Sequence, residues 1–281
     1  MLDILLVALF LYLALNPSRV SAPTRDAIYF CACRLVPSLF MLGVLSRVVA
    51  SLGFTARLYR IFGVAPIAVT ISLLCGVPVG ARLALSLYEQ GAISKKYAEY
   101  LLSFCCTASL PFIIGFVGVT LYGSMRVGVM LCAFLLVSLI VTAVVLKPRR
   151  EERSIKTADF RPQGRIPLRE AVVSGMESMI SVSACAVFFM VLASALGDAL
   201  RLSPLVNALL RAVLEFSSGC AAAAELDKYS LAVCAFSLAW CGVSVVLQVQ
   251  SVVGDRLSLR QFLLGRVICV AIMMLLAVIF G

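Results

Sequence analysis

Two short polar runs interrupt apolar stretches of this chain, and they carry the residue types that could bind a solute. The first run, residues 75–82, reads CGVPVGAR, and the second, residues 215–220, reads EFSSGC. Hydrocarbon offers no hydrogen-bond partner, so non-helical backbone survives at bilayer depth only beside protein or a water-filled cavity. Paired interruptions at corresponding places in two halves indicate the binding site of a transporter.

The first run combines a sharp turn with a positive charge. Gly76 and Gly80 free the backbone from Cβ constraints, and Pro78 fixes the turn and removes a donor. The helix that follows would point its N–H groups and positive dipole at a cavity, which favours an anion. Arg82 lies two positions past the turn, where a guanidinium requires water, a carboxylate or the solute. We expect Arg82 to contact the solute; the alternative is a structural ion pair with Glu215.

The second run contains the one carboxylate that we expect at membrane depth. Glu215 has three open roles: receiving a coupling proton, neutralising Arg82 in the empty protein, or pairing with Arg211 one helical turn earlier. Three residues beside it would supply hydroxyl and backbone donors: Ser217, Ser218 and Gly219.

Two further interruptions fall inside later apolar spans, at residues 107–111 and 241–244. A single hydroxyl in a membrane helix often bonds only its own backbone or a neighbouring helix. Clustered at a break that faces a hairpin tip, such groups are expected to line a pocket. The predicted lining residues are Thr107, Ser109, Ser244 and Gln248. Gln250 lies on a different helix face from Gln248, so we expect only Gln248 to point inward.

The composition indicates a polytopic membrane protein that holds these runs at bilayer depth. The chain has 281 residues, of which 62% are hydrophobic and only 14% charged, and its mean hydropathy is +1.07. Soluble domains are nearer half apolar and a quarter charged. Much of the net charge of +10 sits in short loops, where Lys and Arg set topology, so we expect no nucleic-acid partner.

A basic linker, residues 147–167, divides the chain into two halves and is predicted to be cytoplasmic. The halves, residues 22–146 and residues 168–281, show the same order of segments. The predicted opening spans are 25–50 and 169–196, the re-entrant hairpins 66–87 and 203–226, the interrupted spans 97–121 and 229–253, and the closing spans 127–146 and 262–280. Residues 1–16 are predicted to form a short N-terminal span.

Each half is expected to cross the membrane three times, because a hairpin returns to its own side. An odd number of crossings inverts the second copy, which predicts an all-α fold of two inverted repeats. With the linker inside, the basic residues of the connecting turns also fall inside: Arg57, Arg60, Lys95, Lys96, Arg256 and Arg260.

The eleven cysteines do not indicate a metal site or an enzyme. They lie almost entirely in apolar segments, without a C-x-x-C motif, and the chain contains no histidine. Zinc and iron sites usually need histidine or a spaced cysteine pair, and a cysteine nucleophile needs a base. We therefore expect no metal, no cofactor and no enzymatic activity, with the thiols serving helix packing.

Five motifs together resemble one known family. Residues 76–82 (GVPVGAR), 87–94 (LYEQGAIS) and 103–115 (SFCCTASLPFIIG) resemble the sporulation integral membrane protein family, which carries the nucleoside-recognition gate domain. Residues 214–219 (LEFSSG) and 242–249 (GVSVVLQV) resemble the matching motifs of its second half. The resemblance extends from residue 22 to the C-terminus. The chain departs from the family at Cys106, where an asparagine is usual, and at Pro111, which stands one place later.

The resemblance implies a carrier related to the concentrative nucleoside type, working by alternating access in the cell membrane or the outer forespore membrane. In endospore formers such a protein moves dipicolinic acid, a small planar dianion that suits Arg82 and the hairpin dipole. Two alternatives stay open: a nucleoside or nucleobase transporter, which would want amide-rich contacts, and a non-transporting scaffold of a sporulation complex. A coupling proton or cation and assembly into a homo-oligomer are left undecided.

Overall fold

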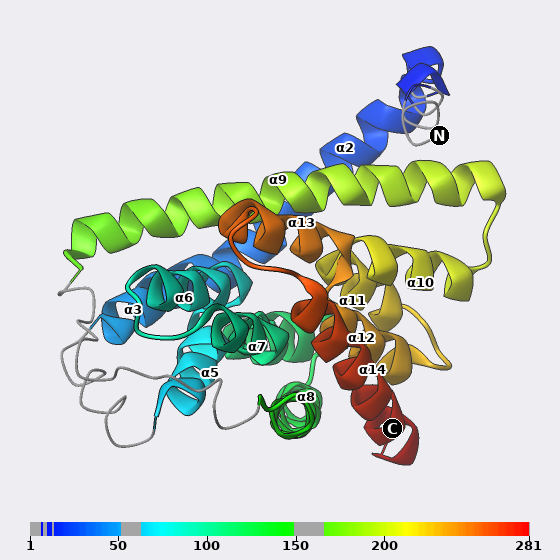
Figure 1. The fold of residues 1–281 in the computed structure, drawn as a ribbon. Coiled ribbons are helices and arrows are strands. Elements are labelled where there is room, and N and C mark those ends of the chain that lie inside the picture. The colour runs from blue at the N-terminus through cyan, green and yellow to red at the C-terminus, as the bar shows by residue number, and fades with distance from the viewer. Residues whose placement is uncertain (1–6, 8–9, 13, 52–62, 149–165, 281) are drawn as a thin grey trace.

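The computed structural model describes residues 7, 10–12, 14–51, 63–148 and 166–280, and every regular element among them is helical (Figure 1). Most of the predicted N-terminal span and linker lie outside the described residues, as do Arg57 and Arg60. The prediction of an all-α fold is confirmed for the part that the structure describes.

The helical segments on the two sides of the linker follow one order. The first side contains α2 (Ser18–Phe30), η1 (Cys31–Leu35), α3 (Val36–Ala50), α5 (Val64–Cys75), α6 (Val77–Glu89), α7 (Lys95–Cys105), η2 (Pro111–Leu121) and α8 (Met125–Val145). The second contains α9 (Leu168–Leu200), α10 (Pro204–Leu214), α11 (Phe216–Ala224), α12 (Ser230–Trp240), α13 (Gly242–Val253) and α14 (Arg260–Phe280). Each side has a long opening segment, two short helices separated by one residue, a broken span and a closing helix of 21 residues. The inverted relation of the halves stays a prediction.

Four helices among the described residues are long and apolar enough to cross a membrane. They are Met125–Val145, Leu168–Leu200, Ser230–Val253 and Arg260–Phe280, and the bent pair Arg19–Leu35 and Leu39–Leu45 makes a fifth if counted as one span. Large apolar side chains such as Ile140, Ile180 and Val278 are exposed on these helices. An outward apolar surface on helices of this length is what hydrocarbon requires, so the protein is an integral membrane protein with several spans.

Closing helices and broken spans from both sides of the chain make the core. Helix α14 packs against α7, α8 and α12, while α6 contacts α13 and η2 contacts α11. Each half of the chain therefore supplies a helix that packs against the broken span or the hairpin of the other half. This interlocking places both hairpins and both breaks in one protein interior.

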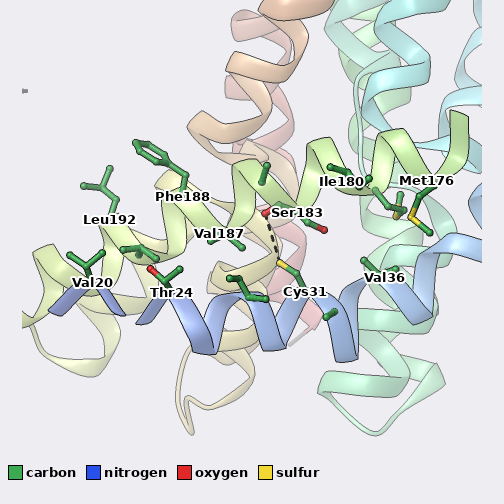
Figure 2. A pocket seen from close by; sticks show the side chains of 15 residues that line it. Val20, Thr24, Cys31, Val36, Met176, Ile180, Ser183, Val187, Phe188 and Leu192 are labelled. Atoms are coloured by element: carbon green, nitrogen blue, oxygen red, sulfur yellow. Dashed lines mark hydrogen bonds between the residues drawn. The ribbon is translucent and has the colours of Figure 1, made fainter. Parts of the chain in front are cut away.

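The opening segments form an outer layer. Helix α9 has 33 residues, about 50 Å at about 1.5 Å per residue, and it runs beside α2 and α3 (Figure 1). Figure 2 shows the open groove between α2 and α9, where the Cys31 thiol lies 4.0 Å from the Ser183 carbonyl oxygen. Nearly all other lining groups are apolar, among them Ile28, Ile180 and Phe188, which suits contact with lipid chains.

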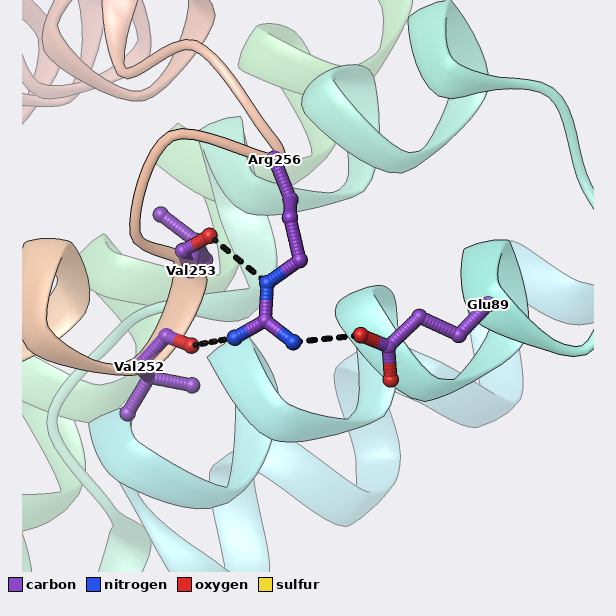
Figure 3. Close-up of polar contacts among 4 residues, drawn as sticks. All are labelled: Glu89, Val252, Val253 and Arg256. Atoms are coloured by element: carbon purple, nitrogen blue, oxygen red, sulfur yellow. Dashed lines mark hydrogen bonds and ion pairs between the residues drawn. The ribbon is translucent and has the colours of Figure 1, made fainter.

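Polar contacts tie two turns from opposite sides of the chain. Arg256 forms an ion pair with Glu89 and donates to two carbonyl groups at the end of α13 (Figure 3). The backbone N–H of Ser258 donates to the Glu99 carboxylate at 2.8 Å. The α6–α7 and α13–α14 turns therefore lie together. The placement of Lys95, Lys96, Arg256 and Arg260 on the cytoplasmic side stays a prediction.

Candidate functional site

A small cavity lies where the hairpin tips, the breaks and the outer layer meet. Its volume is about 80 Å³, and its walls come from α3, the α5–α6 tip, the α7–η2 break, α9, the start of α11, and α13. Four predicted site residues line it: Gly76, Pro78, Ser109 and Gln248. Gln250 is exposed on the other face of α13 and donates to the Gly254 carbonyl at 3.1 Å. The prediction that only one of these two amides points inward is confirmed.

In each half the hairpin tip touches the break of the same half. A Cβ at Gly76, where φ is 85°, would lie 3.8 Å from the Ser109 Cβ. A Cβ at Gly242, where φ is 83°, would lie 3.0 Å from the Glu215 Cα. Positive φ and close backbone approach both favour glycine at these positions. The predicted clustering of breaks against tips is therefore present in the structure.

Glu215 caps the helix that follows it. Its carboxylate, in a residue only 2% exposed, accepts from the backbone N–H groups of Ser217 (3.0 Å) and Ser218 (2.7 Å) and from the Ser217 hydroxyl (2.6 Å). A carboxylate at a helix N-terminus satisfies free donors and the dipole. Glu215 forms no ion pair with Arg82 or Arg211 in the part of the chain that the structure describes. The backbone N–H groups at this hairpin tip are therefore already hydrogen-bonded to the Glu215 carboxylate.

Removing this cap should destabilise the protein measurably. Glu215→Ala leaves the first N–H groups of α11 without their acceptor, at a cost of about 0.5–2 kcal/mol, and should lower the midpoint of thermal unfolding in detergent. Glu215→Gln keeps one acceptor oxygen and should lose less. An alanine variant as stable as the unmodified protein would contradict the capping role.

Two other predicted residues serve close packing and lie outside the cavity lining. A Cβ at Gly80 would stand 2.0 Å from the Cys105 carbonyl oxygen, and a Cβ at Gly219 would stand 2.4 Å from the Ala212 Cα. The first contact lets α6 press on α7, and the second closes the α10–α11 hairpin. Small residues allow such backbone approach between membrane helices.

Three predicted residues lie apart from the cavity. Thr107 and Ser244 are buried in the two breaks, and their hydroxyls have no hydrogen-bond partner among the described residues. Arg82 is exposed on α6, on the same helical face as Glu89 two turns later. Its contact with a solute stays a prediction, since Arg82 is not among the residues that line the cavity and it forms no ion pair with Glu215 within the described residues.

The charged side chain that does line the cavity is Arg47, in the last turn of α3. It donates to the hydroxyls of Ser174 (3.2 Å) and Ser178 (2.6 Å) on α9, and it forms no ion pair within the described residues. A Cβ at Gly175 would lie 2.7 Å from the Val44 side chain and 3.8 Å from the guanidinium. This glycine lets α3 approach and lets Arg47 cross α9.

A cavity of this kind favours an anion. The N-terminal ends of α6 and η2 line it through Val77 and Pro111, and each helix start carries about half a positive charge. Arg47 adds a full positive charge to this wall. The third nearby helix start, that of α11, is already neutralised by Glu215.

Sequence reasoning missed Arg47, although a signal existed. An arginine three positions before the end of the predicted span 25–50 needs a partner. Ser174 and Ser178 are four apart, on one face of the other opening span. The sequence around either segment does not show that the Arg47 face of α3 packs against the serine face of α9.

Part of this sequence is similar to that of a known protein. The chain is 24% identical over 189 residues to the sporulation integral membrane protein YlbJ of Bacillus subtilis (strain 168). The match covers 55% of this chain and 46% of that relative, so it spans less than half of the relative's length. No family model and no solved structure matches the chain. The protein is therefore an integral membrane protein distantly similar to one that is connected with sporulation.

Proposed function

We propose that this protein carries a small anionic solute across the membrane by alternating access. The observation that most supports the proposal is the composition of the cavity wall. Both hairpins and both broken spans contribute to it, and Arg47 is its charged group. Discontinuous helices that meet at a central cavity are the usual site of solute binding in secondary transporters.

The size of the cavity supports a mechanism with separate closed and open states. Its volume of about 80 Å³ is well below the roughly 300–1,000 Å³ of ordinary ligand pockets. A solute can enter only when the tips and the outer layer separate. We therefore interpret the structure as a closed form of the carrier.

Dipicolinate is the solute that we propose. A carboxylate group would pair with the Arg47 guanidinium in a charge-assisted hydrogen bond, and the helix starts would attract the second one. Phe112 and Phe216, one from each half, line the cavity with ring centroids 4.8 Å apart. Aromatic faces of this kind can pack against a planar ring. The resemblance to a sporulation family favours the same solute.

Uptake into vesicles tests this proposal. Purified protein in proteoliposomes should accumulate labelled dipicolinate faster than protein-free vesicles of the same lipid, and excess uridine should not compete. Equal uptake by the two preparations would end the dipicolinate proposal. Competition by uridine, or uptake of uridine alone, would favour the nucleoside alternative. No uptake of either solute by folded protein would favour the scaffold.

A further inference from the structure

Arg266 is a fully buried charge without a carboxylate partner. It lies on α14 with 0% of its surface exposed, and it forms no ion pair within the described residues. An ionised side chain inside a membrane protein is costly unless other groups compensate its charge. The groups that contact the Arg266 guanidinium therefore indicate its role.

Two backbone carbonyls supply that compensation. The Arg266 Nη2 donates to the carbonyl oxygen of Ser103 at 3.1 Å, and Nη1 donates to that of Ala239 at 3.3 Å. Nη1 also lies 3.5 Å from the Cys241 sulfur. Ser103 is in the last turn of α7, and Ala239 is in the last turn of α12. These helices are the first arms of the two broken spans, one from each half.

The ends of the two helices together match the charge of one guanidinium. The last four carbonyls of a helix lack partners within it, and they carry about half a negative charge in total. Two helix ends that converge on one point therefore present about one negative charge. A single arginine between them balances this charge without any acidic residue.

The packing of α14 brings the guanidinium to this point. A Cβ at Gly265 would lie 2.2 Å from the Ser103 carbonyl oxygen, so the α14 backbone rests directly on α7. The guanidinium carbon also lies 5.6 Å from the ring centroid of Phe262, within the range of a cation–π contact. Arg266 is thus held between α7 and α12 by its own helix.

We propose that Arg266 is a positioning residue that neutralises the converging ends of α7 and α12 and so holds the two breaks in register. Ser109 lies in the first break, Gln248 lies beyond the second on α13, and both line the cavity. Loss of the charge would let both helix ends move, and the cavity wall with them. The effect of losing the Arg266 charge on solute affinity rests on the proposed function. The effect of this loss on the two breaks does not.

Hydrogen–deuterium exchange of the full-length protein tests the proposal without any solute. Three variants separate the contributions: Arg266→Lys keeps the charge, Arg266→Gln keeps donors only, and Arg266→Met keeps the volume. Exchange in peptides covering residues 103–110 and 239–245 should rise roughly tenfold in the methionine variant, as expected for loss of a charge at a buried helix end. The glutamine variant should be intermediate and the lysine variant nearest to the unmodified protein.

A matched variant distinguishes this local effect from general destabilisation. Met273 is fully buried on the same helix, so Met273→Ala should raise exchange broadly rather than at the two breaks. Equal behaviour of the lysine and methionine variants, or of lysine and glutamine, would overturn the charge role. A rise at only one break would overturn the link between the halves. If the methionine variant does not fold, the lysine and glutamine pair decides the result.

Discussion

Replacing Arg47 with alanine is expected to weaken dipicolinate binding by roughly 10- to 100-fold, the range for losing a hydrogen bond to a charged group. Arg47 is the charged side chain in the described cavity wall. In the solute-free protein its donors are used by two serine hydroxyls, which can bond elsewhere once the guanidinium is gone. The fold should therefore survive. Isothermal titration of the purified protein with dipicolinate would measure the change.

Arg82→Ala is the matched control, because it removes the same charge from a nearby helix. Arg82 is exposed and outside the cavity wall, so its removal takes away no direct contact with the solute and should change the affinity by less than about threefold. Arg47→Lys should bind with intermediate affinity, since lysine keeps the charge but not the planar fork. Lost binding in the Arg82 variant with normal binding in the Arg47 variant would place the solute on the exposed face of α6 instead.

The hairpin tips and the breaks could be predicted because their signals are local. Glycine and proline interrupt an apolar run wherever the chain bends, and Gly76 and Gly242 both have positive φ in the structure. The helical period placed Gln248 and Gln250 on different faces of one helix, and the structure shows that Gln248 is the buried one. Such features depend on residues within one or two turns of each other.

The position of each charge could not be predicted in the same way. Arg47 reaches serines that are 127 and 131 residues away in the chain, so its role depends on how α3 and α9 align. Arg82 turns outward because Gly80 and Ala81 turn the opposite face of α6 into the core. A helical pattern shows that two faces exist but not which partner each one meets.

Glu215 and Arg266 show the same difference between features with a local signal in the sequence and features that depend on tertiary packing. A glutamate directly before Phe-Ser-Ser at a helix start has a local capping explanation, which was not among the three roles expected from the sequence. Arg266 lies in a segment that reads as an ordinary closing span. Only the convergence of α7 and α12 on α14 reveals why a charge is there. The sequence shows that Glu215 and Arg266 fall in apolar segments, whereas the hydrogen bonds of the folded protein show what each one contacts.

Replacing Gly80 with alanine is expected to cause the largest loss of stability among the substitutions considered. The added Cβ would stand 2.0 Å from the Cys105 carbonyl oxygen and 2.7 Å from the Ser72 hydroxyl oxygen. A backbone oxygen cannot rotate away, so α6 must move off α7. Overpacking of this kind costs about 3 kcal/mol, which should lower the apparent unfolding temperature by roughly 5–10 °C. Thermal unfolding of the purified protein in one detergent measures the shift.

Gly115→Ala provides the control, because it adds the same methyl group to another helical segment. A Cβ at Gly115 would meet nothing within 4 Å, and the substitution restricts the unfolded chain, so stability should stay the same or rise slightly. The difference between the two variants isolates the contact of α6 with α7 from any general effect of losing a glycine. Equal unfolding temperatures would show that α6 tolerates displacement. The tip at Gly76 would then not be held by this contact, and the cavity would be kept closed by the other elements of its wall.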